Sequence, residues 1–344
     1  MTRTLILLTV LGLIVGCGQS GPASRDDVAP PEAPDGASTA APPAPEAPEA
    51  QKAGGYKIAV VPKGLVHQFW LTVKAGAEAA AGEYGAEIVW NGPPKETEVA
   101  TQIEILEDMI TSGVDAIVMA ACHETALIDV LQRAAGKGIP IVTIDSGVKS
   151  DIPVTFVATD NLAGAKAAAH ALAELVGEQG KVGVIPFVPG AATSELREKG
   201  FLEGIAEFPN ITALEPLYSQ SDVAKGMAVT EDMMTAHADL KGIFAANEAS
   251  AIGAAQALEA AGKAGAIKLV AFDAPDEEIQ ALKKGTIQAL IVQNPFQMGY
   301  QGVKAAIDHI EGRPVEKRID TGVTVVTMDN FNEPDVQKLL YPLK

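Results

Sequence analysis

Cysteine and basic residues are both scarce in this sequence. The 344 residues contain two cysteines, Cys17 and Cys122, too few and too far apart for a disulfide framework or a cysteine-based zinc site. Lys and Arg number 26 against 44 Asp and Glu, which gives a formal net charge of −18. Nucleic-acid binding needs a basic patch, so this balance argues against a nucleic-acid partner. It fits an acidic, exported protein.

The N-terminus lacks an apolar run long enough to span a membrane. Residues 1–16 carry Arg3 and then a short apolar stretch that ends in Leu-Ile-Val-Gly before Cys17. This resembles the lipobox of bacterial lipoproteins, in which the signal is cut before a cysteine whose thiol carries diacylglycerol. An ordinary signal peptide or a buried cysteine is the alternative. We predict a lipoprotein signal peptide and a protein of the cell envelope or periplasm, anchored to a membrane through lipidated Cys17 only.

The segment 17–55 has little that could form a core. It is rich in Pro, Ala, Glu and Ser, and such a composition cannot bury enough apolar surface to fold. We expect a disordered, lipid-anchored tether that holds the folded part away from the membrane. Outside the anchor only Cys122 remains, and we expect it to be an inert buried thiol rather than a nucleophile.

Aromatic residues are also few, at 5%, so those in a loop carry more weight. The stretch 58–77 reads as a buried strand, a polar loop and a helix. The loop offers a cation, an imidazole and two adjacent aromatics, and ligands bind where loops leave the carboxyl ends of parallel strands. We therefore predict ligand contacts from Lys63, His67, Phe69 and Trp70. The alternative is that both aromatics belong to the core.

From residue 56 onward, strand and helix signals alternate, and the pattern restarts at residue 160. This alternation predicts an α/β fold made of two similar units, each with a doubly wound parallel sheet. A helix over 296–311 and a terminal strand over 321–328 are left over and could belong to either unit.

No recognised catalytic motif is present in the sequence. The five histidines, at positions 67, 123, 170, 237 and 309, have no metal-ligand spacing. We therefore expect no metal, no cofactor and no enzymatic activity, although an enzyme on the same scaffold stays open.

Several predicted strands end in polar residues. The strand-end acids and amides are Asp145, Asn247, Asp273 and Gln293. Strand ends of parallel sheets share one crevice, and carboxylates and amides there bind pairs of sugar hydroxyls, while aromatic faces cover C–H patches. The alternative for each Asp is a cap on the next helix.

From Tyr56 to Asn330 the chain resembles periplasmic sugar-binding proteins of ABC transporters, of the ribose-binding type. The stretches that carry the resemblance are GVDAIVM, KGIPIVTIDS, ATDNLAGAKAA, ELREKGFLEGI, GIFAANEASAIGAAQALEAAGK, VAFDAPDEEIQALKKGTIQALIVQNPFQMGYQGVKAA and EGRPV. The resemblance implies the type I periplasmic-binding-protein fold, in which three crossing segments join two Rossmann-like lobes around the ligand. It places 56–159 with 294–322 in the N-terminal lobe and 160–293 with 323–344 in the C-terminal lobe.

The resemblance also adds site residues to those named above. The ribose binders have an Arg at the position of Ser146, after Asp145, and a second Arg at the position of Glu195, with Arg197 two residues on. We include Ser146, Glu195 and Arg197 as ligand-binding candidates. The missing guanidinium groups argue against ribose itself, and Pro62-Lys63 with the WNGP motif is closer to the rhamnose- and autoinducer-binding branch.

The implied function is that of a monomeric solute-binding protein that captures a sugar or sugar-like molecule and delivers it to an ABC permease. A binding protein that serves a chemoreceptor or sensor kinase is the main alternative. A regulator of the lactose-repressor type shares the fold, but it would need an N-terminal helix-turn-helix where this chain has a signal and a tether.

Overall fold

The structure is a computed structural model that describes residues 55–343. The predicted signal peptide, Cys17 and the predicted tether, except Gly55, lie outside the described residues. No helix within 55–343 is long and apolar enough to cross a membrane.

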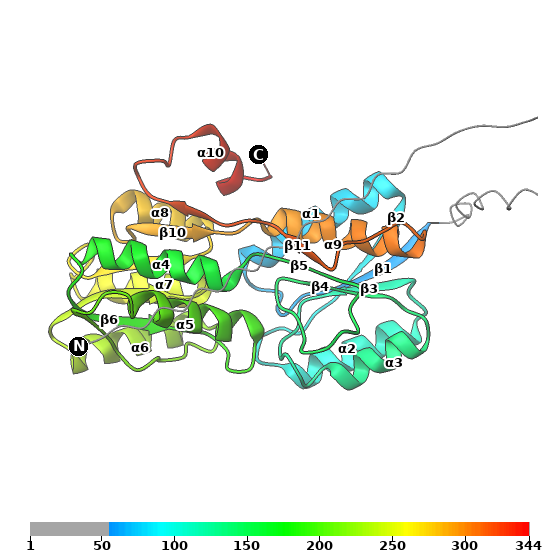
Figure 1. The fold of residues 1–344 in the computed structure, drawn as a ribbon, viewed down its shortest axis with the longest axis horizontal. Helices are drawn as coiled ribbons and strands as arrows, with labels where there is room; N and C mark the ends of the chain where they lie inside the picture. The colour runs from blue at the N-terminus through cyan, green and yellow to red at the C-terminus, as the bar shows by residue number, and fades with distance from the viewer. Residues whose placement is uncertain (1–54, 344) are drawn as a thin grey trace, which may run out of the picture. The chain divides into compact units, whose positions relative to one another are not determined.

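The first lobe is built on a six-stranded parallel sheet in the order β11-β5-β4-β3-β1-β2. Its strands are β1 (Tyr56–Val61), β2 (Ala86–Trp90), β3 (Ala116–Met119), β4 (Ile141–Ile144), β5 (Thr155–Ala158) and β11 (Arg318–Asp320). Its helices are α1 (Gln68–Tyr84), α2 (Val99–Thr111), α3 (Ile128–Gly136) and α9 (Pro295–Ile310). The central strands are mostly apolar because helices cover both faces: α1 and α9 cover one, and α2 and α3 the other (Figure 1).

The second lobe repeats this plan with the order β12-β10-β9-β8-β6-β7. Its strands are β6 (Gly180–Ile185), β7 (Ile211–Ala213), β8 (Leu240–Ala245), β9 (Lys268–Phe272), β10 (Ala289–Val292) and β12 (Thr324–Val326). Its helices are α4 (Asn161–Leu175), α5 (Ala192–Ile205), α6 (Val223–Ala236), α7 (Glu248–Ala260), α8 (Asp276–Lys284) and α10 (Pro334–Leu340). The core between the sheet and helices α4 and α5 includes the rings of Phe201, Phe244 and Phe272.

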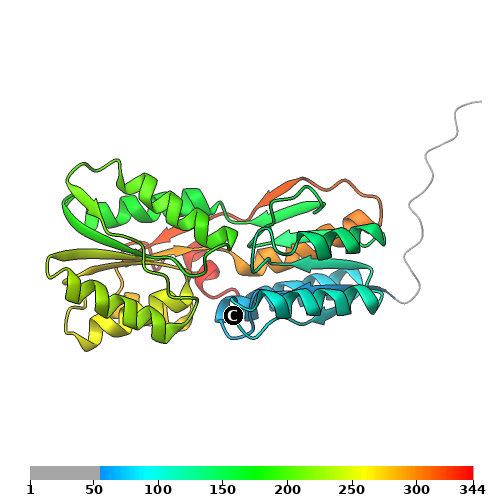
Figure 2. The ribbon, with the colours of Figure 1, turned by 90° about the horizontal axis from the view of Figure 1, so that it is seen from below.

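The chain passes between the sheets three times: after β5, after β10, and between β11 and β12. Helix α9 therefore follows the second lobe in sequence but packs on α1 of the first lobe, as both views show (Figures 1 and 2). Two glycines permit this close approach. A Cβ on Gly76 would lie 2.0 Å from Phe296 O, and one on Gly299 would lie 2.0 Å from Val73 O.

The fold class predicted from the sequence is confirmed, but the end of the chain differs. Only β12 forms within the strand expected over 321–328; a second short strand, β11, comes before this range, and Gly322, with a φ of +77°, lies between the two. The turn sends β12 into the second sheet, where it pairs antiparallel with β10. This edge strand departs from the all-parallel expectation, and helix α10 was not expected.

Candidate functional site

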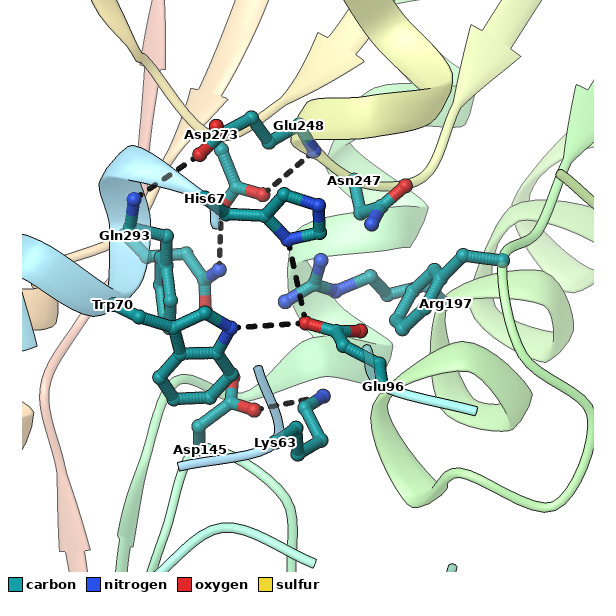
Figure 3. Close-up of a pocket in the computed structure, with 12 residues that line it drawn as sticks. Lys63, His67, Trp70, Glu96, Asp145, Arg197, Asn247, Glu248, Asp273 and Gln293 are labelled. Carbon is teal, nitrogen blue, oxygen red and sulfur yellow. Dashed lines mark hydrogen bonds and ion pairs between the residues drawn. The ribbon is translucent and has the colours of Figure 1, made fainter. Parts of the chain in front are cut away.

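A pocket lies at the carboxyl ends of the strands, and both lobes contribute side chains to it (Figure 3). Its empty space, including the part that is open to solvent, is about 280 Å³. Its lining is polar and aromatic and consists of Lys63, His67, Phe69, Trp70, Glu96, Asp145, Phe187, Arg197, Asn247, Glu248, Asp273 and Gln293.

Two aspartates occupy equivalent positions in the lobes. Asp145 follows β4 and Asp273 follows β9, and both are buried. Each has a positive φ, +53° for Asp145 and +89° for Asp273. A non-glycine residue in this region costs about 1–3 kcal/mol of strain, and such strain gathers at functional sites. The strained turn directs each carboxylate into the pocket instead of letting the strand continue.

Lys63 follows β1 and is 3% exposed. Its Nζ lies 3.0 Å from Asp145 Oδ2 and donates a 3.0 Å hydrogen bond to Thr193 Oγ1 of the second lobe. Burial works to lower the pKa of Lys63, but the charges of Asp145 and Glu96 outweigh it and the pKa is raised. The ammonium group therefore stays charged and joins the lobes beneath the pocket.

Arg197 comes from helix α5 and is 2% exposed. Its Nε donates to Asn161 Oδ1 at 2.8 Å, its Nη1 donates to Ala246 O at 2.7 Å, and the guanidinium lies 3.7 Å from the ring centroid of Phe272. These two hydrogen bonds use two of its five donors. The group is rigidly held and keeps donors for a ligand.

Glu96, from the loop after β2, organises the opposite wall of the pocket. Its Oε1 accepts from Trp70 Nε1 at 3.0 Å and lies 3.5 Å from His67 Nδ1, and its Oε2 accepts from Ser221 of the second lobe at 3.1 Å. Burial would raise the pKa of Glu96, but the charge of Lys63 and the hydrogen bond to His67 hold it well below its usual range. Burial would lower the pKa of His67, but Glu96, Glu248 and Asp273 raise it to about 9.

Asp273 is the centre of a third group of contacts. Its Oδ2 accepts from the Glu248 backbone N–H at 3.0 Å, and its Oδ1 accepts from Gln293 Nε2 at 2.6 Å. Burial raises its pKa, although Arg197 and Gln293 oppose this. Gln293 Oε1 is buried without a hydrogen-bond partner among the described residues. A ligand hydroxyl that donates to this oxygen would satisfy it.

Asn247 both caps a helix and lines the pocket. Its Oδ1 accepts from Ser250 N at 3.1 Å, which caps α7, while its Nδ2 donates to Ser221 Oγ at 2.8 Å at the pocket. Asp145 and Asp273 cap no helix that directly follows them; the cap position of α8 is Pro275, which makes no side-chain cap bond.

Nine of the eleven predicted ligand-binding residues line this pocket, and Ser146 and Glu195 do not. Glu195 is exposed, and its Oε1 accepts from Gly190 N at 2.8 Å within its own lobe. Arg197, two residues further along α5, is buried and lines the pocket. The pocket therefore contains a guanidinium group, although position 195 does not supply it. Ser146 is fully buried, and its backbone O accepts from Ala121 N at 2.9 Å.

Three lining residues were missed: Glu96, Phe187 and Glu248. Glu248 directly follows Asn247, so the strand-end pattern could have included it. Phe187 also follows a strand, β6, after one proline. Glu96 lies six residues beyond β2 in a loop, and no pattern marks it.

Metal or thiol chemistry finds no support in the described part of the chain. Residues 55–343 contain no group of His, Cys, Asp and Glu that could hold a metal ion. Cys122 is fully buried, and burial raises the pKa of its thiol, so it stays protonated. The site therefore offers hydrogen-bond donors, acceptors and rings, which suit binding.

Comparison with known proteins supports this chemistry. Residues 58–314 match the family described as periplasmic binding protein domain. The chain belongs to the periplasmic binding protein family. It is 34% identical over 284 residues to the D-ribose/D-allose-binding protein of Pseudomonas aeruginosa, an alignment that covers 79% of this chain and 88% of that protein.

Two further members are similar. The ribose import binding protein of Haemophilus influenzae is 31% identical over 275 residues, covering 78% of this chain and 91% of the other. An ABC transporter solute-binding protein from Agrobacterium vitis, solved with D-fucose, is 39% identical with a TM-score of 0.81, covering 83% of this chain and 100% of that one. These periplasmic binding proteins bind solutes for transport and are not enzymes, as we expected of this chain.

Proposed function

We propose that this periplasmic binding protein captures one neutral monosaccharide between its lobes and delivers it to the permease of an ABC importer. The observation that carries the proposal is the pair of strained aspartates, Asp145 and Asp273, which face one small pocket from opposite lobes. Carboxylates are acceptors only, and they make strong, short hydrogen bonds to hydroxyl groups. Both lobes therefore bind the same sugar ring, and these shared contacts favour the closed arrangement of the lobes.

The charges of the pocket favour a neutral ligand. Carboxyl groups outnumber cationic side chains among the lining residues, since Glu96, Asp145, Glu248 and Asp273 accompany Lys63, His67 and Arg197. Lys63 is already paired with Asp145, and His67 with Glu96. A sugar phosphate or sugar acid would find Arg197 as the one cation among the described lining residues outside an ion pair, but it would also face four carboxyl groups, and burying a further negative charge beside them is costly.

The size of the pocket and the relatives narrow the ligand class. The lining residues converge from both lobes on one small space, which favours a single sugar ring over a disaccharide. The relatives named above are described with D-ribose, D-allose and D-fucose. With Arg197 in the pocket, one of the two objections to a ribose-like pyranose disappears, so aldopentoses and aldohexoses are the first sugars to test.

The cellular setting follows from the same relatives and from the N-terminus. Import binding proteins deliver solutes to transporters, which favours the importer over the chemoreceptor or sensor kinase that the sequence left open. The lipobox-like run before Cys17 supports a lipid anchor that keeps the monomeric protein near its permease in the cell envelope.

A thermal-shift screen tests the proposed ligand class. We expect one or more of D-ribose, D-allose, D-fucose, D-tagatose and L-rhamnose to raise the Tm, because a ligand at 100 times its Kd stabilises the folded state by about 2.7 kcal/mol. Ribose 5-phosphate, gluconate and maltose serve as charged and oversized controls. A panel in which only the charged sugars stabilise the protein would overturn the proposal.

A further inference from the structure

Helix α1 begins without a cap from its own lobe. Its N-cap residue is His67, whose side chain makes no cap hydrogen bond. The first N–H groups of a helix have no acceptor within the helix and need one from elsewhere. For α1 that acceptor is Glu248, the first residue of α7 in the opposite lobe: its Oε1 accepts from Gln68 N at 3.0 Å and its Oε2 accepts from Phe69 N at 3.1 Å.

Glu248 is connected to the pocket in two ways. Glu248 donates its own backbone N–H to Asp273, and Phe69, which it holds by the main chain, lines the pocket. A parallel contact supports the junction, since Asp276 N of the second lobe donates to Gln68 Oε1 at 3.0 Å. Figure 3 shows Glu248 and Asp273 side by side above His67.

We propose that Glu248 is a positioning residue for capture: on lobe closure its carboxylate caps helix α1 of the opposite lobe and thereby fixes the aromatic wall that Phe69 begins. This rests on the proposed function, because closure around a sugar is the event that would bring α7 to α1. The cap is a contact that only the closed arrangement makes, and only such contacts shift the balance between open and closed states.

The helix end and His67 favour the ionised form of the Glu248 carboxylate, while burial opposes it. A negative group at a helix N-terminus is favoured by the helix dipole, and charge-assisted hydrogen bonds to backbone N–H are strong. The titratable groups that act on Glu248 are His67 of the first lobe and Asp273 of the second lobe. The charge of Glu248 in turn contributes to the raised pKa of Glu278 on α8. Burial raises the pKa of Glu248 to about 7, against the charge of His67 and the two N–H groups.

Amide hydrogen exchange at Gln68 and Phe69 tests the proposed cap directly. The Gln68 and Phe69 amides have Glu248 as their acceptor, so we expect Glu248→Ala to accelerate their exchange about tenfold or more, with Glu248→Gln, which keeps one acceptor oxygen, in between. Glu195→Ala is the matched control. Glu195 is also an acid in the first turn of a helix that accepts from a backbone N–H, but its partner, Gly190, belongs to its own lobe. This control should accelerate exchange of the Gly190 amide and leave exchange of the Gln68 and Phe69 amides unchanged.

The measurement is made with and without the sugar that raises the Tm most in the screen. With that sugar, Glu248→Ala should also lower affinity about tenfold or more, mainly through faster dissociation. If a sugar binds but exchange at Gln68 and Phe69 is the same in wild type and Glu248→Ala, the cap is overturned and the function stands. If no sugar binds but the variant still accelerates these amides, Glu248 caps α1 without closure, so the link between the cap and capture fails together with the proposed ligand class. If neither effect appears, both are overturned.

Discussion

Lys63 shows at the scale of one residue how closely stability and binding are joined in this site. Its ammonium group and the carboxylate of Asp145 are both almost completely buried, 3.0 Å apart. Removing one member of such a pair leaves the other as an uncompensated charge, which costs about 3–5 kcal/mol. We therefore expect Lys63→Met to lower the free energy of unfolding by this amount in denaturant titrations.

The double variant Lys63→Met/Asp145→Asn is the control for that prediction. It removes both charges, and asparagine tolerates the positive φ at position 145. We expect it to recover most of the lost stability. Equal destabilisation of the single and double variants would show that packing of the lysine stem, and not its charge, is what matters.

His67 makes the stability depend on pH. Against the effect of burial, Glu96, Glu248 and Asp273 raise its pKa from 6.5 to about 9. A raised pKa means that protonation favours the folded state, so the contribution is complete below pH 6.5 and is lost as the pH rises through about 9. We expect the free energy of unfolding to fall by roughly 1–3 kcal/mol across this window.

His67→Gln should remove this part of the pH dependence. The raised pKa of Glu248 has the same sign but acts lower, between 4.5 and about 7, so it overlaps only the lower end of the His67 window. Unfolding measured from pH 6.5 to 9 separates the two. A wild-type slope that persists unchanged in His67→Gln would contradict the assignment.

The sequence located most of the pocket because its polar residues stand directly after buried strands. Asp145, Asp273 and Gln293 are of this kind, and parallel topology alone brings them together. Arg197 and Glu96 depend on a helix and a long loop, whose course is set by tertiary packing. Asp273 also makes contacts within the fold, because its carboxylate accepts hydrogen bonds from Glu248 N and Gln293 Nε2.

At the scale of elements, the contact between α1 and α9 depends on having no side chain where the helices cross. A Cβ at Gly299 would lie 2.0 Å from Val73 O, a backbone atom that cannot move aside cheaply. We expect Gly299→Ala to lower the Tm by forcing the helices apart, at a cost of about 1–3 kcal/mol.

Gly82 provides the control within the same helix pair. It lies on the exposed side of α1, and a Cβ there meets nothing within 4 Å. Gly82→Ala should therefore stabilise the protein by about 0.5–1 kcal/mol through helix propensity. Thermal melting of both variants checks the pair, and stabilisation by Gly299→Ala would refute the close crossing.

The element pattern was predictable where strands and helices are long and apolar on the expected faces. It failed at the end of the chain, where β11 and β12 have three residues each. Strands this short carry no period of their own. Their place is decided by the turn at Gly322 and by the sheet edges that they meet, neither of which is visible in local sequence.

At the scale of the whole molecule, membrane attachment depends on Cys17, which lies outside the described residues. We expect Cys17→Ala to release the protein into the soluble fraction or to leave the signal uncut, because the thiol would carry the diacylglycerol. Cell fractionation and mass spectrometry of the mature N-terminus measure this, with Cys122→Ala as a control that keeps attachment. An unmodified mature N-terminus at another residue would contradict the lipid anchor.

The central claim is that one neutral sugar is held from both lobes by Asp145 and Asp273. Titration calorimetry of wild type, Asp145→Asn and Asp273→Asn with the sugar identified in the screen tests it most directly. Asp160→Asn is the control, because Asp160 caps α4 outside the pocket and asparagine caps equally well. We predict a loss of about 2–3 kcal/mol, or roughly 30–150-fold in Kd, for each pocket variant and none for the control. Unchanged affinity in either pocket variant would contradict the claim that both lobes hold the ligand.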